Sequence, residues 1–212
     1  MFGLTIRMQI SAISSWFGLP QLLGVLAAYA LGCLNTGYYL VRWKTGRDLR
    51  QSGSGNAGAK NAGRVLGPRG FAVSFLGDIV KGALAVWGAQ QAGFATPAQA
   101  LVLLAVIAGH VWPVQLGWRG GKGMSTSFGA LLFFDPLIAG VLFAMCVLLL
   151  AFTRRFTPSA LGAYALSPLV AALLGGDLAA IATLFVFASM VLFAHRDNLR
   201  VEFGRGPATP PA

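Results

Sequence analysis

The chain has 212 residues, of which 56% are hydrophobic and only 10% are charged, and its mean hydropathy is +0.70. Soluble domains are about 45–50% apolar and about 25% charged, so this composition excludes an ordinary soluble protein and indicates one that folds in a bilayer. The net charge of +10 would suggest nucleic-acid binding in a soluble protein. Here the cations lie beside apolar segments, as the positive-inside rule predicts for a membrane protein.

Seven apolar segments are predicted to span the membrane, although several are shorter than the about 20 residues that a spanning helix usually needs. In chain order they are residues 16–41, 71–90, 98–114, 122–134, 136–152, 158–175 and 178–194. Asp135-Pro136 makes a tight connection between the fourth and fifth, because proline opens a helix and restricts the residue before it. We therefore expect an all-α integral membrane protein with one domain over residues 1–206 and a short proline-rich tail at 207–212.

The lysines and arginines predict the orientation of these spans. Apart from Arg7, before the first span, and Lys81, inside the second, all of them lie in the segments that follow the first, third, fifth and seventh spans. Alternating helices place those segments on one face, and the cationic face is the cytoplasmic one. The N-terminus is then outside and the C-terminus cytoplasmic.

A cleaved signal peptide is the alternative for the first span, since Arg7 precedes an apolar run and Ala28-Tyr29-Ala30 resembles a cleavage site. The run stays apolar through Val41, which favours a membrane span. Cys33 and Cys146 both fall within spans, where packing is a better explanation than a disulfide, a metal site or a nucleophile.

The first polar motif lies in the longest polar stretch, residues 42–70, which is predicted to be a loop. It reads Ser54-Gly55-Asn56-Ala57-Gly58-Ala59-Lys60-Asn61-Ala62-Gly63-Arg64. Glycines let backbone N–H groups face a ligand, and the cations supply countercharge for an anion such as phosphate. A dinucleotide fingerprint is excluded, because a basic loop rather than a strand precedes the motif. A flexible connection with helix caps is the structural alternative.

The second polar motif is Gly120-Gly121-Lys122-Gly123, at the start of the fourth span. It is not a Walker site, because Leu116 and Gly123 stand where that motif needs glycine and a hydroxyl residue. A glycine-rich turn with lysine at a helix start favours an anion through free N–H groups and the helix dipole. His110, ten residues before Gly120, fits either a site role or packing at a span end.

The third polar motif, His195-Arg196-Asp197-Asn198-Leu199-Arg200, follows the last span directly. Basic residues there would serve simply to anchor the helix at the membrane interface. An anchor does not require His195 or Asn198, whose side chains can transfer a proton or bind a hydroxyl or phosphate oxygen. If the last helix continues through this motif, His195, Asn198 and Leu199 lie on one face. Ser159, where the connection between the fifth and sixth spans enters the sixth, falls on the same side of the membrane.

Together these motifs resemble those of the bacterial acyl-phosphate-dependent glycerol-3-phosphate acyltransferases (PlsY). That family is similar in carrying G-S-G-N-x-G-x-x-N-x-x-R, G-H-x-x-P followed by G-G-K-G, and H-R-x-N, here beginning at Gly53, Gly109 and His195. Asp78, Lys81 and Gly82 also look like the family, and the resemblance covers about residues 29–206. The chain departs from the pattern at Lys60, where a small hydroxyl residue is usual, and in lacking a terminal acid.

The resemblance implies a multi-pass enzyme of the bacterial inner membrane, acting in phospholipid biosynthesis with its active site facing the cytoplasm. It would transfer a fatty acyl group from acyl phosphate to the sn-1 hydroxyl of glycerol 3-phosphate, giving lysophosphatidic acid and phosphate. A soluble enzyme that makes acyl phosphate is an implied partner, and no metal, cofactor or nucleic acid is implied. The implied catalytic residues are Ser54, Arg64, Lys122, His195 and Asn198, and the implied substrate-binding residues are Gly55, Asn56, Asn61, Gly120, Gly121, Gly123, Ser159 and Arg196.

The residue types suit this chemistry on their own. Acyl phosphate is already activated, so transfer needs positioning and oxyanion stabilisation rather than a covalent acyl-enzyme. Either His195 or a substrate phosphate oxygen could accept the hydroxyl proton. Asp78 and Lys81, at i and i+3, are predicted to form an ion pair that supports the site.

A transporter of phosphate or an organophosphate is the alternative function. Such carriers place the substrate at the membrane midplane between repeated halves, whereas this sequence shows no internal repeat and collects its polar motifs at one face.

Overall fold

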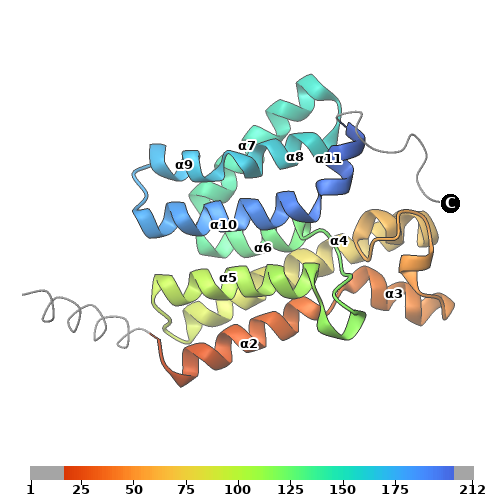
Figure 1. Ribbon diagram of the computed structural model, residues 1–212, viewed down its shortest axis with the longest axis horizontal. Coiled ribbons are helices and arrows are strands. Elements are labelled where there is room, and N and C mark those ends of the chain that lie inside the picture. Colours follow the sequence, from red (N-terminus) through yellow and green to blue (C-terminus); the bar gives the residue numbers. More distant parts are fainter. Residues whose placement is uncertain (1–16, 203–212) are drawn as a thin grey trace, which may run out of the picture.

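A computed structural model describes residues 17–202 of the chain, and this part of the protein is helical with no β-strand (Figure 1). The helices are α2 (Leu19–Cys33), α3 (Thr36–Thr45), α4 (Ala59–Gln91), α5 (Thr96–Val111), α6 (Met124–Phe134), α7 (Pro136–Thr153), α8 (Phe156–Ala165), α9 (Ser167–Leu173), α10 (Leu178–Ala194) and α11 (Arg196–Glu202), with short 3-10 turns η1 (Leu49–Gln51) and η2 (Val114–Leu116). The prediction of an all-helical protein is confirmed for this part of the chain.

Three helical segments are long and apolar enough to cross a membrane: α4, α5 with η2, and α7. Two bent pairs qualify when each is taken as one span, α2 with α3 at 43° and α8 with α9 at 45°. The remaining apolar helices, α6 and α10, are 11 and 17 residues long. Residues 17–202 thus contain three to five candidate spans by length and composition, and the count of seven stays a prediction.

The first predicted span is not one continuous helix. Arg7 and Trp16 lie outside the described residues, but α2 ends at Cys33 and α3 begins at Thr36 with a different direction. Asn35, between them, is fully buried and donates from Nδ2 to the Cys33 carbonyl 3.3 Å away. Hydropathy alone cannot detect this break, because the segment is apolar on both sides of it. Residues 28–30, the alternative cleavage site, lie inside α2.

The polar stretch at residues 42–70 is largely helical, which corrects its prediction as a loop. Helix α3 continues to Thr45, and α4 begins at Ala59, twelve residues before the predicted second span. A kink at Gly67, whose φ is 70°, separates the first turns of α4 from the rest, and Pro68 starts the next turns. Proline is compatible with the first turn of a helix, so the kink joins two helical pieces rather than ending one. Asn61 and Arg64 are consequently helical.

Two helix pairs, α2 with α5 and α4 with α6, approach closely through glycines. A Cβ on Gly32 would lie 2.2 Å from the Val106 carbonyl oxygen, and one on Gly109 would lie 2.1 Å from that of Tyr29. A Cβ on Gly82 would similarly lie 2.1 Å from the Thr126 carbonyl oxygen. Small residues allow such close backbone packing in membrane proteins.

The outward surface of the bundle is apolar. Phe152 is 85% exposed and Leu178 is 81% exposed. Large exposed apolar side chains on several helices are typical of a surface that faces lipid rather than water. This agrees with the composition of the chain.

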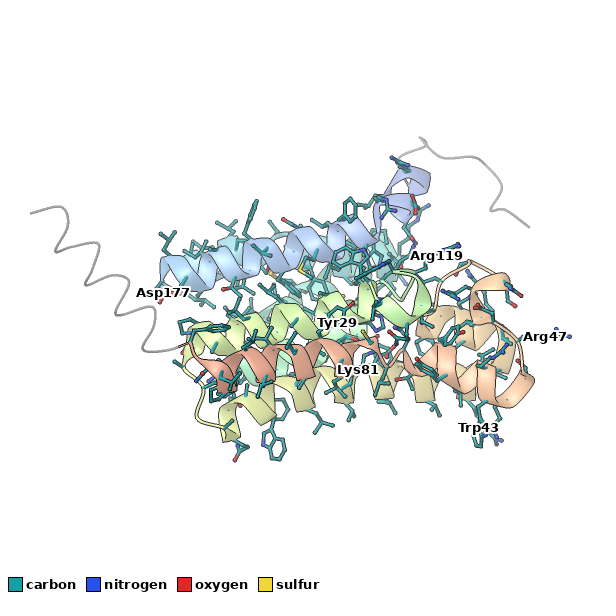
Figure 2. All side chains as sticks on the ribbon, turned by 60° about the horizontal axis from the view of Figure 1, so that its bottom comes forward. Tyr29, Trp43, Arg47, Lys81, Arg119 and Asp177 are labelled. Carbon is teal, nitrogen blue, oxygen red and sulfur yellow. The ribbon has the colours of Figure 1, made fainter. Side chains whose placement is uncertain are left out.

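The polar motifs gather at one end of the bundle. Figure 1 shows α3, the beginning of α4 and α11 at the same end, with the connection between α9 and α10 at the other. In Figure 2, Arg47 and Arg119 mark the first end and Asp177 the opposite one. We call the end that carries Arg47 and Arg119 the basic end.

Candidate active site

Asn61 organises the turn that carries Ser54. Its side chain is 1% exposed. Its Oδ1 accepts a hydrogen bond from the Ser54 N–H at 3.0 Å, and its Nδ2 lies 2.8 Å from the Ser52 carbonyl oxygen and 2.9 Å from that of Asn56. All polar atoms of this amide therefore have protein partners. Ser54 and Gly55 themselves are exposed.

Arg64 lies one turn beyond Asn61 on α4 and passes beside the same turn. A Cβ on Gly53 would lie 3.1 Å from Arg64 Cδ, so a larger residue there would crowd the arginine stem. Gly53 also has a φ of 55°, a left-handed conformation that favours glycine. The Arg64 guanidinium has no hydrogen bond or ion pair with residues 17–202. It is an exposed cation available to a ligand.

The first and second motifs contact each other through Gly120. The Ala57 N–H donates to the Gly120 carbonyl at 3.3 Å, and Asn56 Nδ2 donates to the same oxygen at 3.4 Å. Asn56 Oδ1 meanwhile accepts from the Gly58 N–H at 2.8 Å, just before α4 begins. Asn56 therefore joins the two motifs rather than presenting its amide to solvent.

The N–H groups of Gly120 and Gly121 already have protein acceptors. Gly120 donates to the Val111 carbonyl at 3.1 Å, while Gly121 donates to the His110 carbonyl at 3.0 Å and to Asn35 Oδ1 at 3.1 Å. A Cβ on Gly120 would lie 2.1 Å from the His110 carbonyl oxygen, so glycine is needed there for close backbone approach.

The start of α6 is the part of the second motif that can receive an anion. Gly123, with a φ of 83°, forms the N-cap of α6. The first N–H groups of a helix have no partners within it, and the helix dipole places partial positive charge at them. The 11-residue α6 therefore presents N–H donors next to the Lys122 side chain.

Lys122 connects the second motif to the third. Its Nζ donates a hydrogen bond to Asn198 Oδ1 on α11. Burial lowers the pKa of the Lys122 ammonium, the Asp197 carboxylate opposes that shift, and the cations Arg196 and Lys60 add to it. Three cationic side chains thus influence one another at the basic end, and an anionic ligand would relieve their repulsion.

His195 is the C-cap of α10, and its ring is neutral. The last helix does not continue unbroken through this motif, because α10 ends at Ala194 and α11 begins at Arg196. His195 Nδ1 lies 2.8 Å from the Val191 carbonyl oxygen. A carbonyl only accepts, so Nδ1 carries the hydrogen and Nε2 keeps its lone pair. Burial, with a smaller contribution from Lys122, lowers the His195 pKa to about 4, against the hydrogen bond to Val191, which raises it.

This low pKa predicts how pH affects stability. An unfolded His195 would bind a proton below its ordinary pKa of 6.5, whereas the folded ring stays neutral down to about 4. The stabilising contribution is therefore present above pH 6.5 and is lost as pH falls toward 4. We expect His195→Gln to show a smaller fall in melting temperature than the original protein between about pH 7 and about pH 5, measured by heating both in detergent. Equal falls would contradict the neutral, buried ring.

A fourth polar segment adds α8 to the basic end. Lys60 Nζ donates to Thr157 Oγ1 at 3.0 Å and lies 5.9 Å from the centre of the Phe156 ring, so it connects α4 to α8. Ser159, which is 1% exposed, is held within this segment by Thr153 Oγ1 and the Arg155 carbonyl, each 2.7 Å from its Oγ. Its hydroxyl is thus occupied in the structure.

Arg196 is exposed beside His195 at the start of α11. Its Nη1 donates to the Phe193 carbonyl at 3.2 Å, and its guanidinium lies 4.6 Å from the centre of the Phe193 ring. The three motifs and the α8 segment therefore meet at one end of the bundle, although Asn56, Asn61 and Ser159 turn their polar atoms toward the protein.

Asn35 is the residue of this region that sequence reasoning missed. It lies inside the predicted first span, yet its buried Oδ1 accepts from Gly121, 86 positions along the chain. A lone asparagine in an apolar run was the available signal. Among residues 17–202, no three His, Cys, Asp or Glu side chains gather to hold a metal ion, and Cys33 and Cys146 are free thiols.

These features define the class of the protein: a helical membrane protein whose polar motifs and cationic side chains gather at one end of its bundle. The family model for glycerol-3-phosphate acyltransferase matches residues 22–203. The chain therefore belongs to the glycerol-3-phosphate acyltransferase family.

Individual relatives agree with this assignment. The chain is 42% identical to glycerol-3-phosphate acyltransferase 1 of Desulfitobacterium hafniense (strain Y51), over 86% of this chain and 91% of the relative. Its fold is similar to the crystal structure of PlsY (YgiH), an integral membrane glycerol 3-phosphate acyltransferase, in its glycerol 3-phosphate form, with a TM-score of 0.80 and 28% identity over 89% of this chain and 94% of that one. The lysophosphatidic acid form of PlsY matches with a TM-score of 0.77, at 26% identity over the same shares of the two chains.

Proposed function

We propose that this protein transfers a fatty acyl group from acyl phosphate to the sn-1 hydroxyl of glycerol 3-phosphate, producing lysophosphatidic acid and phosphate. The observation that supports it best is the contact between Lys122 and Asn198, which brings a cation, the start of α6 and the third motif together. Membership of the glycerol-3-phosphate acyltransferase family supports glycerol 3-phosphate as the acyl acceptor. The acyl phosphate donor is inferred from the motifs and from the absence of any need for a covalent intermediate in its chemistry.

The reaction is a direct displacement at the acyl carbon. The sn-1 hydroxyl oxygen bonds to the carbonyl carbon, the bond from that carbon to the phosphate oxygen breaks, and phosphate leaves with the bonding electrons. Nε2 of neutral His195 accepts the hydroxyl proton, because Nδ1 already donates to the Val191 carbonyl. The start of α6 stabilises developing negative charge, and phosphate, a good leaving group, makes an acyl-enzyme unnecessary.

We assign substrate binding to the exposed donors of the site, and a supporting role to the groups that already bond within the protein. Arg64 and Ser54 are both exposed, and the Arg64 stem passes beside Gly53, the residue before Ser54. These two side chains bind the phosphate of glycerol 3-phosphate, assisted by Arg196. Lys122 and the first N–H groups of α6 bind the phosphate of the donor. The remaining residues act mainly through their internal contacts: Gly55, Asn56, Asn61, Gly120, Gly121, Gly123, Ser159 and Asn198 shape the segments that carry these donors.

We place the protein in the bacterial inner membrane with seven spans, counting α6 and α10, and with the basic end in the cytoplasm, where a soluble enzyme would supply acyl phosphate. The clustering of arginine and lysine at this end supports that orientation. Cysteines introduced singly at the exposed positions Ser54, Arg119 and Asn198, in a background lacking Cys33 and Cys146, should react with a membrane-impermeant maleimide only in inside-out vesicles. Labelling of any one of them from the periplasmic side would overturn the orientation.

The function is tested by measuring lysophosphatidic acid formed by the purified protein in detergent, with glycerol 3-phosphate as acceptor and either palmitoyl phosphate or palmitoyl-CoA as donor; phosphate release is measured in parallel for the palmitoyl phosphate reaction. Release that requires both substrates and yields lysophosphatidic acid supports the proposal. If lysophosphatidic acid forms from palmitoyl-CoA but not from palmitoyl phosphate, the proposed donor is wrong. If it forms from neither donor, the proposed acyltransferase activity is wrong, and the transporter alternative is favoured.

A further inference from the structure

Three ionisable side chains form a buried cluster in the interior of the bundle, where Figure 2 shows Lys81 between the two ends. Lys81 Nζ lies 2.9 Å from Asp78 Oδ1 and 2.8 Å from His110 Nδ1. The predicted ion pair of Asp78 and Lys81 is thus confirmed, and His110 packs against it. All three side chains are buried, and none of them has a role in the reaction proposed above.

The ion pair holds the break between α2 and α3. Lys81 Nζ also lies 3.0 Å from the Gly32 carbonyl oxygen and 2.8 Å from that of Leu34, at the end of α2. Asp78 Oδ1 accepts from Thr36 Oγ1 at 3.1 Å, at the start of α3. The cation therefore lies at a helix C-terminus and the carboxylate at a helix N-terminus, which is the favourable placement for both dipoles.

Gly121 is held on one side by His110 of this cluster and on the other by Asn35, at the break that the ion pair fixes. The Lys81 ammonium has no lone pair, so His110 Nδ1 accepts from it and Nε2 carries the hydrogen. A Cβ on Gly121 would lie 2.0 Å from His110 Nε2, so the ring packs directly against this glycine. From the other side, the Gly121 N–H donates to Asn35 Oδ1. Asn35 is the residue at the break that the ion pair fixes.

Fold stability does not by itself account for these charges. Ionisable groups within membrane-spanning helices are costly, and apolar residues of similar volume often replace a buried ion pair without loss of stability. The cluster, however, is in contact with the residue that immediately precedes Lys122. A shift of the break or of the His110 ring would move Gly121, and with it the start of α6.

We propose that Asp78, Lys81 and His110 are positioning residues that fix Gly121 and thereby set the place of the Lys122 ammonium and of the first N–H groups of α6. This rests on the proposed function, since the positioned groups are the ones assigned to the donor phosphate. The cluster works through Gly121 and does not touch the substrates.

The first test separates positioning from stability. Lys81→Met should lower kcat/KM for palmitoyl phosphate by about a hundredfold, because misplacement of binding groups by about 1 Å costs that much. Lys81→Met also leaves the Asp78 carboxylate buried without its cation, so the melting temperature should fall. The double variant Asp78→Leu with Lys81→Met removes both charges, so its melting temperature should return toward that of the original protein while kcat/KM stays low. Recovery of kcat/KM together with the melting temperature would overturn the proposal.

The second test does not depend on catalysis. His110→Asn keeps an acceptor near Lys81 but removes the ring from Gly121, so amide hydrogen exchange should become faster in the peptide containing residues 120–123 and remain unchanged in α10. Ser74→Ala is the matched control, because Ser74 is a buried polar residue of α4 whose hydrogen bond within residues 17–202 is to the Gly70 carbonyl of its own helix. Exchange in the 120–123 peptide that stays at the level of the original protein would overturn the proposal.

The two proposals can fail separately. If the original protein transfers no acyl group, the proposed function is wrong, and the exchange measurement still decides whether the cluster fixes Gly121. If the original protein is active and His110→Asn exchanges and turns over like it, only the positioning role is wrong.

Discussion

Lys122→Ala is expected to lower kcat/KM for palmitoyl phosphate by about 10²–10³-fold, which is the usual cost of removing a group that stabilises charge in a transition state. Lys122 is the cation beside the start of α6, and Asn198 fixes its Nζ. This hydrogen bond directs the ammonium toward the third motif. The measurement is initial-rate phosphate release at varied palmitoyl phosphate and saturating glycerol 3-phosphate.

Two further variants make this result specific. Lys122→Met keeps the length of the side chain without its charge and should lose as much activity as Lys122→Ala. Arg119→Ala removes an exposed cation three residues earlier that makes no ion pair within residues 17–202 and should retain activity. The assignment of Lys122 is wrong if Lys122→Met is as active as Arg119→Ala.

Arg64→Ala is expected to raise the KM for glycerol 3-phosphate with a smaller change in kcat. A hydrogen bond to a charged group contributes about 1.5–3 kcal/mol, which corresponds to about 10–150-fold in KM. The exposed guanidinium has no partner within residues 17–202, so its removal leaves no protein group unsatisfied and should not destabilise the fold. Initial rates at varied glycerol 3-phosphate measure the effect.

Arg69→Ala is the control for this prediction. Arg69 is an exposed arginine on the same helix, beyond the kink at Gly67, so its loss changes the net charge equally but leaves the proposed site intact. Arg64→Lys should recover part of the affinity, because it restores the charge but not the paired N–H donors. Equal KM values for Arg64→Ala and Arg69→Ala would remove Arg64 from the site.

Much of the fold was predictable because it depends on local properties of the chain. Helices α5, α7 and α10 follow the predicted spans within two or three residues, since long apolar runs and a proline at a helix start act over short distances. The ion pair of Asp78 and Lys81 was predictable for the same reason, as residues three apart on a helix are neighbours. The break at Asn35 was not, because apolar composition continues through it.

That this is a helical membrane protein with cations beside its polar motifs could be inferred from the sequence alone, because apolar composition and charge are properties of each segment. It also contained the three motifs that identify the family. Which polar groups stay free for a ligand became clear from the packing of the helices. Asn61 turned out to be fully occupied, Gly121 donates to Asn35, and His195 is neutral. Each of those states depends on burial or on a partner distant in the chain, and a buried polar group must find such a partner because water cannot supply one.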